Sequence, residues 1–383
     1  MKLAVLRQSS VAQLASQRRV TQMSSIAMAS SLVATRVAAP TPRTSAATAR
    51  SAPPHVGPKS RATAPLVGRL AAKAYTPRAS VAAAAGPDIA ALQSKFGIPG
   101  SVEILAGREG LPSVRLTHAC GASAEIALFG GTVLSWKQAN GSEVLYCRPD
   151  AKFDKSKPIS GGIPHCFPQF GPGPDMQQHG FARNLDWDVA ATSADPQPDE
   201  ADPEVQLVLS PSDYTEKMWP GRKFKVLYTV TLHGETLRTD FRVLNEGDAP
   251  FSFTSALHTY FEVAGIDKAR VTGLKGKTYL DKTVDANNPP SASETRDAVT
   301  FSGPVDSVYV DAGDYCELEV GTGAAVAVAS EGWSDTIVWS PWTSMEDCYK
   351  EFCCVEKGAA VKPIEVEAGG SWRARMDLSV VDL

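Results

Sequence analysis

FKVLYTVTLHGETLRTDFRVLNEG (residues 224–247) is the stretch that predicts the fold of this chain most directly. Two runs rich in β-branched and aromatic residues alternate along it and meet around Gly234-Glu235, the pattern of an antiparallel hairpin. Shorter β-type runs recur along the chain from about residue 98: EVLYC (143–147), VQLVLS (205–210), AAVAVAS (324–330), DTIVWS (335–340) and FCCVE (352–356). We therefore expect a chain built from short strands.

Helical pattern is confined to two segments, PDIAALQSKFG (87–97) and SDYTEKMW (212–219). Strands and helices do not alternate, which disfavours a parallel α/β sheet, and no repeat of propeller or solenoid period stands out. No obvious linker interrupts residues 88–383. We predict a single all-β domain over this range, a large β-sandwich with few short helices.

The first 87 residues differ in composition from the rest of the chain. They contain no Asp or Glu, carry twelve Lys and Arg, and are rich in Ala, Ser, Thr and Pro. This profile is typical of an organelle transit peptide, and the run PRASVAAAAG (77–86) favours a plastid over a mitochondrion. The run SSIAMASSLVATRVAA (24–39) is too interrupted for a secretory signal, and a membrane span needs about 20 apolar residues. We predict that 1–87 is a disordered transit peptide and that the protein acts in the chloroplast stroma.

The charge of the remaining chain argues against a nucleic-acid partner. All 42 acidic residues but only 26 of the 38 basic ones (38 minus 12) lie in 88–383, a formal charge of −16. A protein that binds phosphate backbones carries the opposite sign. If the substrate is an anion, a local basic cluster must bind it.

Two residues are candidates for acid–base chemistry. In FSFTSALHTYFEV (251–263), read as one strand, alternation places His258 on the polar face with Tyr260, beside small residues that leave room for a ligand. The alternative is a solvated face with an incidental histidine. In EFCCVEKG (351–358), Glu356 ends an apolar run, and half-burial would raise its pKa toward that of a useful base. The alternative is a strand-end glutamate in solvent.

The run GGIPHCFPQFGPGPDMQQHGFARNLDW (161–187) is an irregular loop, stiffened by glycine and proline. Stiff loops hold side chains in place. Gln178, His179 and Arg183 offer neutral donors and acceptors and one fixed cation, a set that suits hydroxyl groups and an anion better than a metal. A loop stabilised only by its own side chains is the alternative.

Metal and nucleotide sites lack their usual sequence patterns. A cupin-like cluster would need a closely spaced His-x-His pair followed by Glu, and no HExxH, calcium loop or phosphate loop is present. No Gly-x-Ser-x-Gly elbow occurs. The seven cysteines have no paired CxxC spacing, so we expect free thiols. We predict no metal and no cofactor.

Five motifs in order resemble those of the aldose 1-epimerase superfamily, and within it the glucose-6-phosphate 1-epimerase group. They are GGIPHCFPQFG (161–171), QQHGFARNLDW (177–187), SALHTYFEV (255–263), PVDSVYV (304–310) and FCCVEKG (352–358). The similarity spans about residues 98–380.

The resemblance implies a galactose mutarotase-like antiparallel supersandwich, no cofactor, and interconversion of the α and β anomers of glucose 6-phosphate. By matching motifs, it makes His258 the catalytic histidine and Glu356 the catalytic carboxylate. We expect Glu356 to be the base, because a carboxylate is ionised near neutral pH, and His258 to be the acid, because the pKa of histidine lies close to the operating pH. The resemblance assigns substrate binding to Gln178, His179, Arg183 and Asp306, with Asp306 lying in a loop of different length.

One position departs from the pattern. Relatives often carry arginine just before the GGIP motif, where it helps to bind the sugar phosphate, and this chain has Ser160. Arg183 with Lys157 would then have to bind the phosphate. An aldose 1-epimerase acting on unphosphorylated sugars is therefore an alternative, and a non-catalytic carbohydrate-binding domain is another. We expect a monomer that does not associate with membranes.

Overall fold

The computed structural model describes residues 87–173, 176–194 and 202–383. The predicted transit peptide falls outside this part of the chain, apart from residue 87. Every pairing between the strands of the described residues is antiparallel, as expected.

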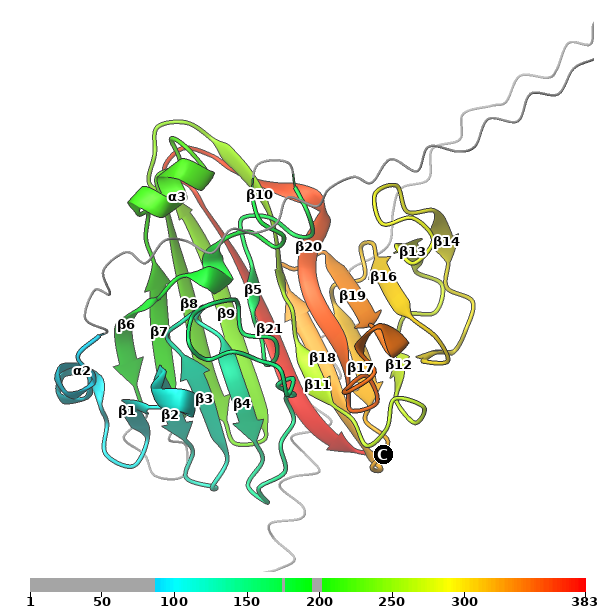
Figure 1. The fold of residues 1–383 in the computed structure, drawn as a ribbon, viewed down its shortest axis with the longest axis horizontal. Coiled ribbons are helices and arrows are strands. Elements are labelled where there is room, and N and C mark those ends of the chain that lie inside the picture. The colour runs from blue at the N-terminus through cyan, green and yellow to red at the C-terminus, as the bar shows by residue number, and fades with distance from the viewer. Residues whose placement is uncertain (1–86, 174–175, 195–201) are drawn as a thin grey trace, which may run out of the picture. The chain divides into compact units, whose positions relative to one another are not determined.

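The strands form three sheets (Figure 1). The four-stranded sheet contains β1 (Val102–Ala106), β2 (Pro112–Thr117), β3 (Ser123–Ala127) and β4 (Val133–Lys137). The eight-stranded sheet has the order β14 (Ser291–Ser293), β13 (Thr278–Asp281), β16 (Val305–Tyr309), β19 (Asp335–Ser340), β20 (Phe352–Val366), β10 (Phe251–Leu257) and β5 (His165–Cys166), with β11 (Tyr260–Glu262) also paired to β20. The nine-stranded sheet has the order β15 (Ala298–Thr300), β12 (Arg270–Thr272), β17 (Tyr315–Glu319), β18 (Ala324–Glu331), β21 (Ser371–Asp382), β9 (Thr236–Asn245), β8 (Phe224–His233), β7 (Glu204–Leu209) and β6 (Asp188–Ser193).

The helices are short, and both α-helices lie where the sequence predicts them. They are α2 (Ile89–Phe96) and α3 (Asp213–Met218), with 3-10 turns at η1 (Arg108–Gly110), η2 (Ala182–Asn184) and η3 (Trp342–Met345). Asp88 caps α2 and Ser212 caps α3 through side-chain oxygens that accept backbone N–H groups. The helices of the described residues are too short and too polar to span a bilayer.

The predicted hairpin is confirmed as β8 and β9, joined by Gly234-Glu235. Alternate residues of both strands are fully buried, among them Tyr228 and Phe241. Phe253 of the eight-stranded sheet belongs to the same apolar cluster, in which Phe253 and Trp372 have ring centroids 5.6 Å apart. The two large sheets thus pack face to face as a β-sandwich, and burial of their apolar faces stabilises it.

One predicted strand is not formed. EVLYC (143–147) makes only isolated bridges, first to Lys137, then to Phe261 and then to Gly161. The segment changes its partner every two residues, so no ladder can grow along it. The local pattern of apolar residues could not reveal this, because it depends on three distant segments.

Candidate active site

His258 lies at a break between two strands. The stretch predicted as one strand divides into β10, which ends at Leu257, and β11, which begins at Tyr260. The His258 backbone N–H donates to the Pro164 carbonyl (3.0 Å), which ties the break to the glycine-rich loop. His258 is only 8% exposed, so a solvated, incidental histidine is excluded.

Glu356 lies within β20 rather than at its end. The strand continues to Val366, with β19 on one side and β10 and β11 on the other, and Glu356 is 1% exposed. Both alternatives drawn from the sequence, half-burial and a strand-end glutamate in solvent, are therefore wrong. The Lys-Gly pair that follows Glu356 in sequence does not form a turn, because strands on both sides satisfy its backbone.

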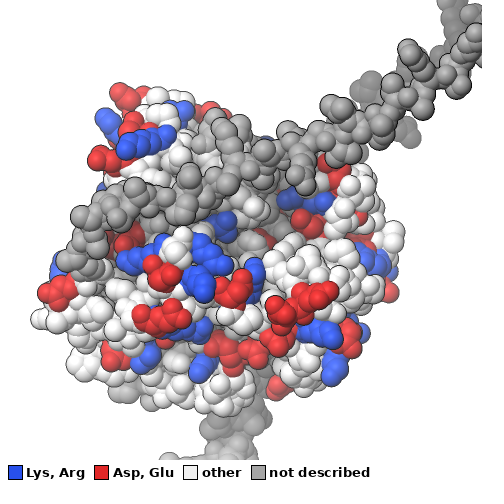
Figure 2. Space-filling view, in the orientation of Figure 1, with Lys and Arg blue, Asp and Glu red and all other residues white. Residues whose placement is uncertain are grey.

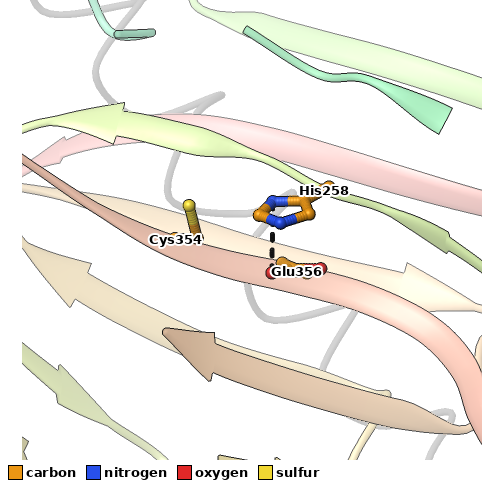
Figure 3. Close-up of side chains that lie close together, drawn as sticks. All are labelled: His258, Cys354 and Glu356. Carbon is orange, nitrogen blue, oxygen red and sulfur yellow. Dashed lines mark ion pairs between the residues drawn. The ribbon is translucent and has the colours of Figure 1, made fainter. Parts of the chain in front are cut away.

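The two side chains meet. His258 Nδ1 lies 3.2 Å from Glu356 Oε1, and Figure 3 shows the imidazole ring above the carboxylate. Nδ1 of the histidine and Oε2 of the glutamate are buried and form no aligned hydrogen bond with the described residues. Buried polar atoms of this kind are rare in folded proteins and mark a site where a ligand completes the bonding.

Burial dominates the electrostatics of the pair. It raises the pKa of Glu356 well above the usual value, and the Asp306 charge adds to this, while Lys282 and Arg183 oppose it. Burial also lowers the pKa of His258 to about 3, with Arg183 as the next cause. Without substrate, the pair is thus favoured in its neutral form, with one proton to exchange.

The loop residues form a wall next to this pair. The His179 ring centroid is 5.5 Å from that of His258, and His179 Nδ1 accepts from the Gly171 backbone N–H (3.1 Å). Gln178 touches His179 Nε2 through its amide nitrogen (3.3 Å), and Arg183 donates to the Gln178 carbonyl (2.8 Å). Burial lowers the pKa of His179 to about 2, so it acts as a neutral group. His179 adopts a positive φ of 66°, a conformation uncommon outside glycine.

Asp306 reaches the site from β16. Its charge is the second cause of the raised Glu356 pKa, which places it near the catalytic candidates, and burial raises its own pKa. The structure thus gathers all six residues predicted from the sequence around one site.

Two contributors to the site were not predicted. Lys282 follows β13, its backbone N–H donates to the Asp306 carbonyl (2.8 Å), and its charge acts on His258 and Glu356. Lys282 lies in the polar run 281–298, whose composition is typical of a surface loop, so the sequence near it does not indicate a role in the site. Trp339 stands edge-on to His258 (5.8 Å between centroids), and in sequence it is only one apolar residue of a β-run.

The charges of the surface are unevenly distributed. On the face shown in Figure 2, basic side chains gather across the middle of the described surface, and acidic side chains lie among and below them. Although residues 88–383 carry a net negative charge, cations are therefore concentrated locally, where they can bind an anion.

Three potential metal ligands lie close together. One donor atom from each of His258, Cys354 and Glu356 falls within 4.8 Å of the others, and Figure 3 shows Cys354 beside Glu356 on β20. His165 is excluded from the site, because it is buried in the core with its Nε2 3.1 Å from the Gly131 carbonyl.

All seven cysteines have free thiols, as predicted.

Comparisons with known proteins show what this chain is similar to. The aldose 1-epimerase family model matches residues 112–379. A "putative glucose-6-phosphate 1-epimerase" from Cenchrus ciliaris is 37% identical over 294 residues, covering 73% of this chain and 88% of the relative. One of the same description from Escherichia coli K12 is 33% identical over 252 residues (62% and 80%). The crystal structure of a "putative mutarotase" from Salmonella typhimurium superposes with a TM-score of 0.63 at 28% identity, covering 71% of this chain and 91% of that one.

Proposed function

This chain belongs to the aldose 1-epimerase family, and we propose that it interconverts the α and β anomers of glucose 6-phosphate. The observation that carries the proposal is the buried His258–Glu356 pair, 3.2 Å apart and incompletely hydrogen-bonded. Anomer interconversion needs one group to take a proton and one to give a proton, and this pair contains both.

The reaction moves two protons and no other groups. A base takes the proton of the C1 hydroxyl while an acid protonates the ring oxygen, and the bond between C1 and the ring oxygen breaks. The free aldehyde rotates about the C1–C2 bond. The ring oxygen then attacks the other face of C1, with both proton transfers reversed. Each such acid or base typically contributes about 10²–10⁴-fold.

We assign Glu356 as the base and His258 as the acid. This assignment needs the proton on the histidine, whereas burial in the free protein favours the neutral pair. Substrate helps to shift the balance, because a phosphate dianion stabilises a nearby imidazolium. Lys282 and Arg183 favour an ionised Glu356 but disfavour a protonated His258, so the substrate anion has to offset their effect on the histidine. The pair holds a single proton in either arrangement, so binding need only move it from one partner to the other.

The wall residues suit recognition of a sugar. Gln178, His179 and Asp306 offer donors and acceptors to ring hydroxyls, and Arg183 adds a fixed positive charge. Hydrogen bonds of this kind orient the substrate so that C1 and the ring oxygen face the catalytic pair.

The test is the anomerisation of freshly dissolved α-glucose 6-phosphate, followed by NMR, with wild type, His258→Ala and Glu356→Gln. We expect acceleration by wild type and near-spontaneous rates for both variants. Matched controls are His233→Ala, at the end of β8, and Glu246→Gln, directly after β9, which alter partly exposed residues and should retain activity. Wild-type rates retained by either site variant would refute the acid–base assignment.

Free glucose, tested in parallel, addresses the second candidate function. Ser160 carries no charge where relatives often have arginine, which favours an aldose 1-epimerase acting on unphosphorylated sugars. Acceleration of glucose alone would establish that alternative. Acceleration of neither sugar, by folded protein, would favour a carbohydrate-binding domain.

We also propose that the protein is imported into plastids. The support is the composition of residues 1–87, basic and without acidic residues. Import of the full chain into isolated chloroplasts, followed by N-terminal sequencing of the stromal product, tests this. Cleavage near residue 87 is expected, and import into mitochondria instead would overturn the assignment.

A further inference from the structure

Arg148 lies directly opposite Ser160. Cys147 and Gly161 form an antiparallel bridge, flanked by a hydrogen bond from the Arg148 N–H to the Ser160 carbonyl (3.0 Å). The approach is close because residue 161 is glycine: a Cβ there would lie 2.4 Å from the Cys147 Cα. Residues directly opposite in an antiparallel pair project to the same face, so Arg148 projects to the face of Ser160.

The same segment supports the catalytic histidine. The Tyr146 N–H donates to the Tyr260 carbonyl (3.0 Å), and the Gly162 carbonyl accepts from the Tyr260 N–H (2.9 Å). The Tyr260 ring stacks on His258 with centroids 4.9 Å apart. Arg148 therefore lies two residues from Tyr146, whose backbone holds the tyrosine that stacks on His258.

The charge of Arg148 also acts on the site. Burial raises the pKa of Tyr260, and Arg148 is one of the cations that oppose this effect. Burial raises the pKa of Cys354, and Arg148 opposes that as well. Arg183 acts on Tyr260 too, and it also acts on His258 and Glu356, for which Arg148 is not among the causes. The effect of Arg148 is thus confined to the Tyr260 and Cys354 side of the site.

The guanidinium of Arg148 has unused hydrogen-bonding capacity. Its side chain is 18% exposed, and its Nε is buried without a hydrogen-bond partner among the described residues. Its nearby anion is Asp150, at 2.9 Å, which is half-exposed and also lies 3.6 Å from Lys157. An ion pair with an exposed carboxylate is weak, so a dianion of better geometry can displace it.

We propose that Arg148 binds the phosphate group of the substrate, from the segment opposite Ser160, and so sets the preference for phosphorylated over free sugars. The inference rests on the proposed function. The position of Arg148 also fits the structure of the substrate, because the phosphate is attached to C6 and takes no part in the reaction at C1 and the ring oxygen. Arg148, opposite Ser160 and two residues from the Tyr146–Tyr260 hydrogen bond, is therefore placed for the phosphate and not for the reacting atoms.

The test compares KM and kcat for glucose 6-phosphate and for glucose in wild type, Arg148→Ala and Arg148→Lys. A lost charge-assisted contact should raise KM for glucose 6-phosphate about 10- to 100-fold. The kcat for that substrate and the rate with glucose should change less than about twofold. Lysine should give an intermediate KM, because it keeps the charge without the bidentate geometry. Arg115→Ala, which removes an arginine paired with Glu103 in another sheet, is the matched control and should leave both substrates unaffected.

A double variant provides a test in which the charge is kept. Arg148→Ser combined with Ser160→Arg moves the guanidinium across the strand pair, and most of the affinity for glucose 6-phosphate should return. An unchanged KM in Arg148→Ala would overturn the inference, as would an equal loss on both sugars, which indicates a structural role. If Arg148→Ala does not fold, failure of the folded double variant to bind glucose 6-phosphate overturns it. Failure of the proposed function is recognised separately, because wild type would then not accelerate glucose 6-phosphate at all.

Discussion

Replacing Glu356 by glutamine should make the protein more stable while it abolishes activity. Burial raises the pKa of this carboxyl, so the folded state binds its proton more tightly than the unfolded chain does. For such a group, stability is present below the unfolded pKa of about 4.5 and falls as the pH rises above it. Glutamine keeps the shape and does not ionise, and it removes this loss.

The magnitude follows from the pH and the unfolded pKa. Holding the carboxyl protonated at pH 7 costs at most about 1.4 kcal/mol for each of the roughly 2.5 pH units above 4.5, or about 3.5 kcal/mol. Lys282 and Arg183 reduce this cost by favouring the carboxylate. We expect a gain of about 1–3 kcal/mol at pH 7, or roughly 2–6 °C in Tm, and less than about 1 kcal/mol at pH 5.

Urea unfolding at pH 7 and pH 5 measures both values. Glu294→Gln is the matched control, because Glu294 is also buried but its pKa is shifted in the opposite direction. Hydrogen bonds from Arg296 lower the Glu294 pKa to about 2, so its stabilisation is present above pH 4.5 and is lost as the pH falls. Glu294→Gln should therefore destabilise the protein at both pH values, by about 1–2 kcal/mol after allowance for the exposure of Arg296. A Glu356→Gln protein that is less stable than wild type at pH 7 would refute the reasoning.

Four further predictions concern stability, the wall, metal and assembly. Burial lowers the pKa values of His165, His179 and His258 to about 4, 2 and 3, so the stability that these three histidines contribute is complete above pH 6.5 and is lost on acidification. Glu356 acts in the opposite direction and cancels the effect of about one histidine. The free energy of unfolding, measured in urea, should therefore fall by about 2–3 kcal/mol per pH unit between pH 6 and 5, and a flat profile would contradict this. Gly180→Ala, at φ 72° and with its Cβ 2.2 Å from a backbone oxygen, should lower Tm and raise KM, whereas unchanged values would argue against a rigid wall. Extensive dialysis against EDTA should leave the rate of anomerisation unchanged, and activity restored only by added zinc would overturn the prediction of a metal-free enzyme. Light scattering after gel filtration should give the mass of a monomer, and a dimer mass would correct that expectation.

Local patterns predicted much of the fold. The alternation in 224–247 requires one apolar face on each strand, and the short turn at Gly234-Glu235 sets the pairing of neighbouring strands. Helix caps at Asp88 and Ser212 depend on residues within one turn. These features depend on near neighbours in the chain, so the sequence alone is enough to place them.

The identities of the site residues were also available from the sequence, through motifs that resemble a known family. Their environment was not. The break at His258, the full burial of Glu356, and the distance of 3.2 Å between them come from strands and loops far apart in the chain. Periodicity even suggested an uninterrupted strand and a half-buried glutamate, and both expectations were wrong.

The charges around the pair depend most on tertiary structure. Lys282 and Arg148 lie in segments with no site-like pattern, and pairing with Asp306 and Ser160 carries them to the site. A pKa depends on burial and on charges through space, and neither is a property of local sequence. The sequence alone therefore predicted an all-β fold, the hairpin at 224–247 and six candidate site residues, while only packing decided how those residues are charged and which cations act on them.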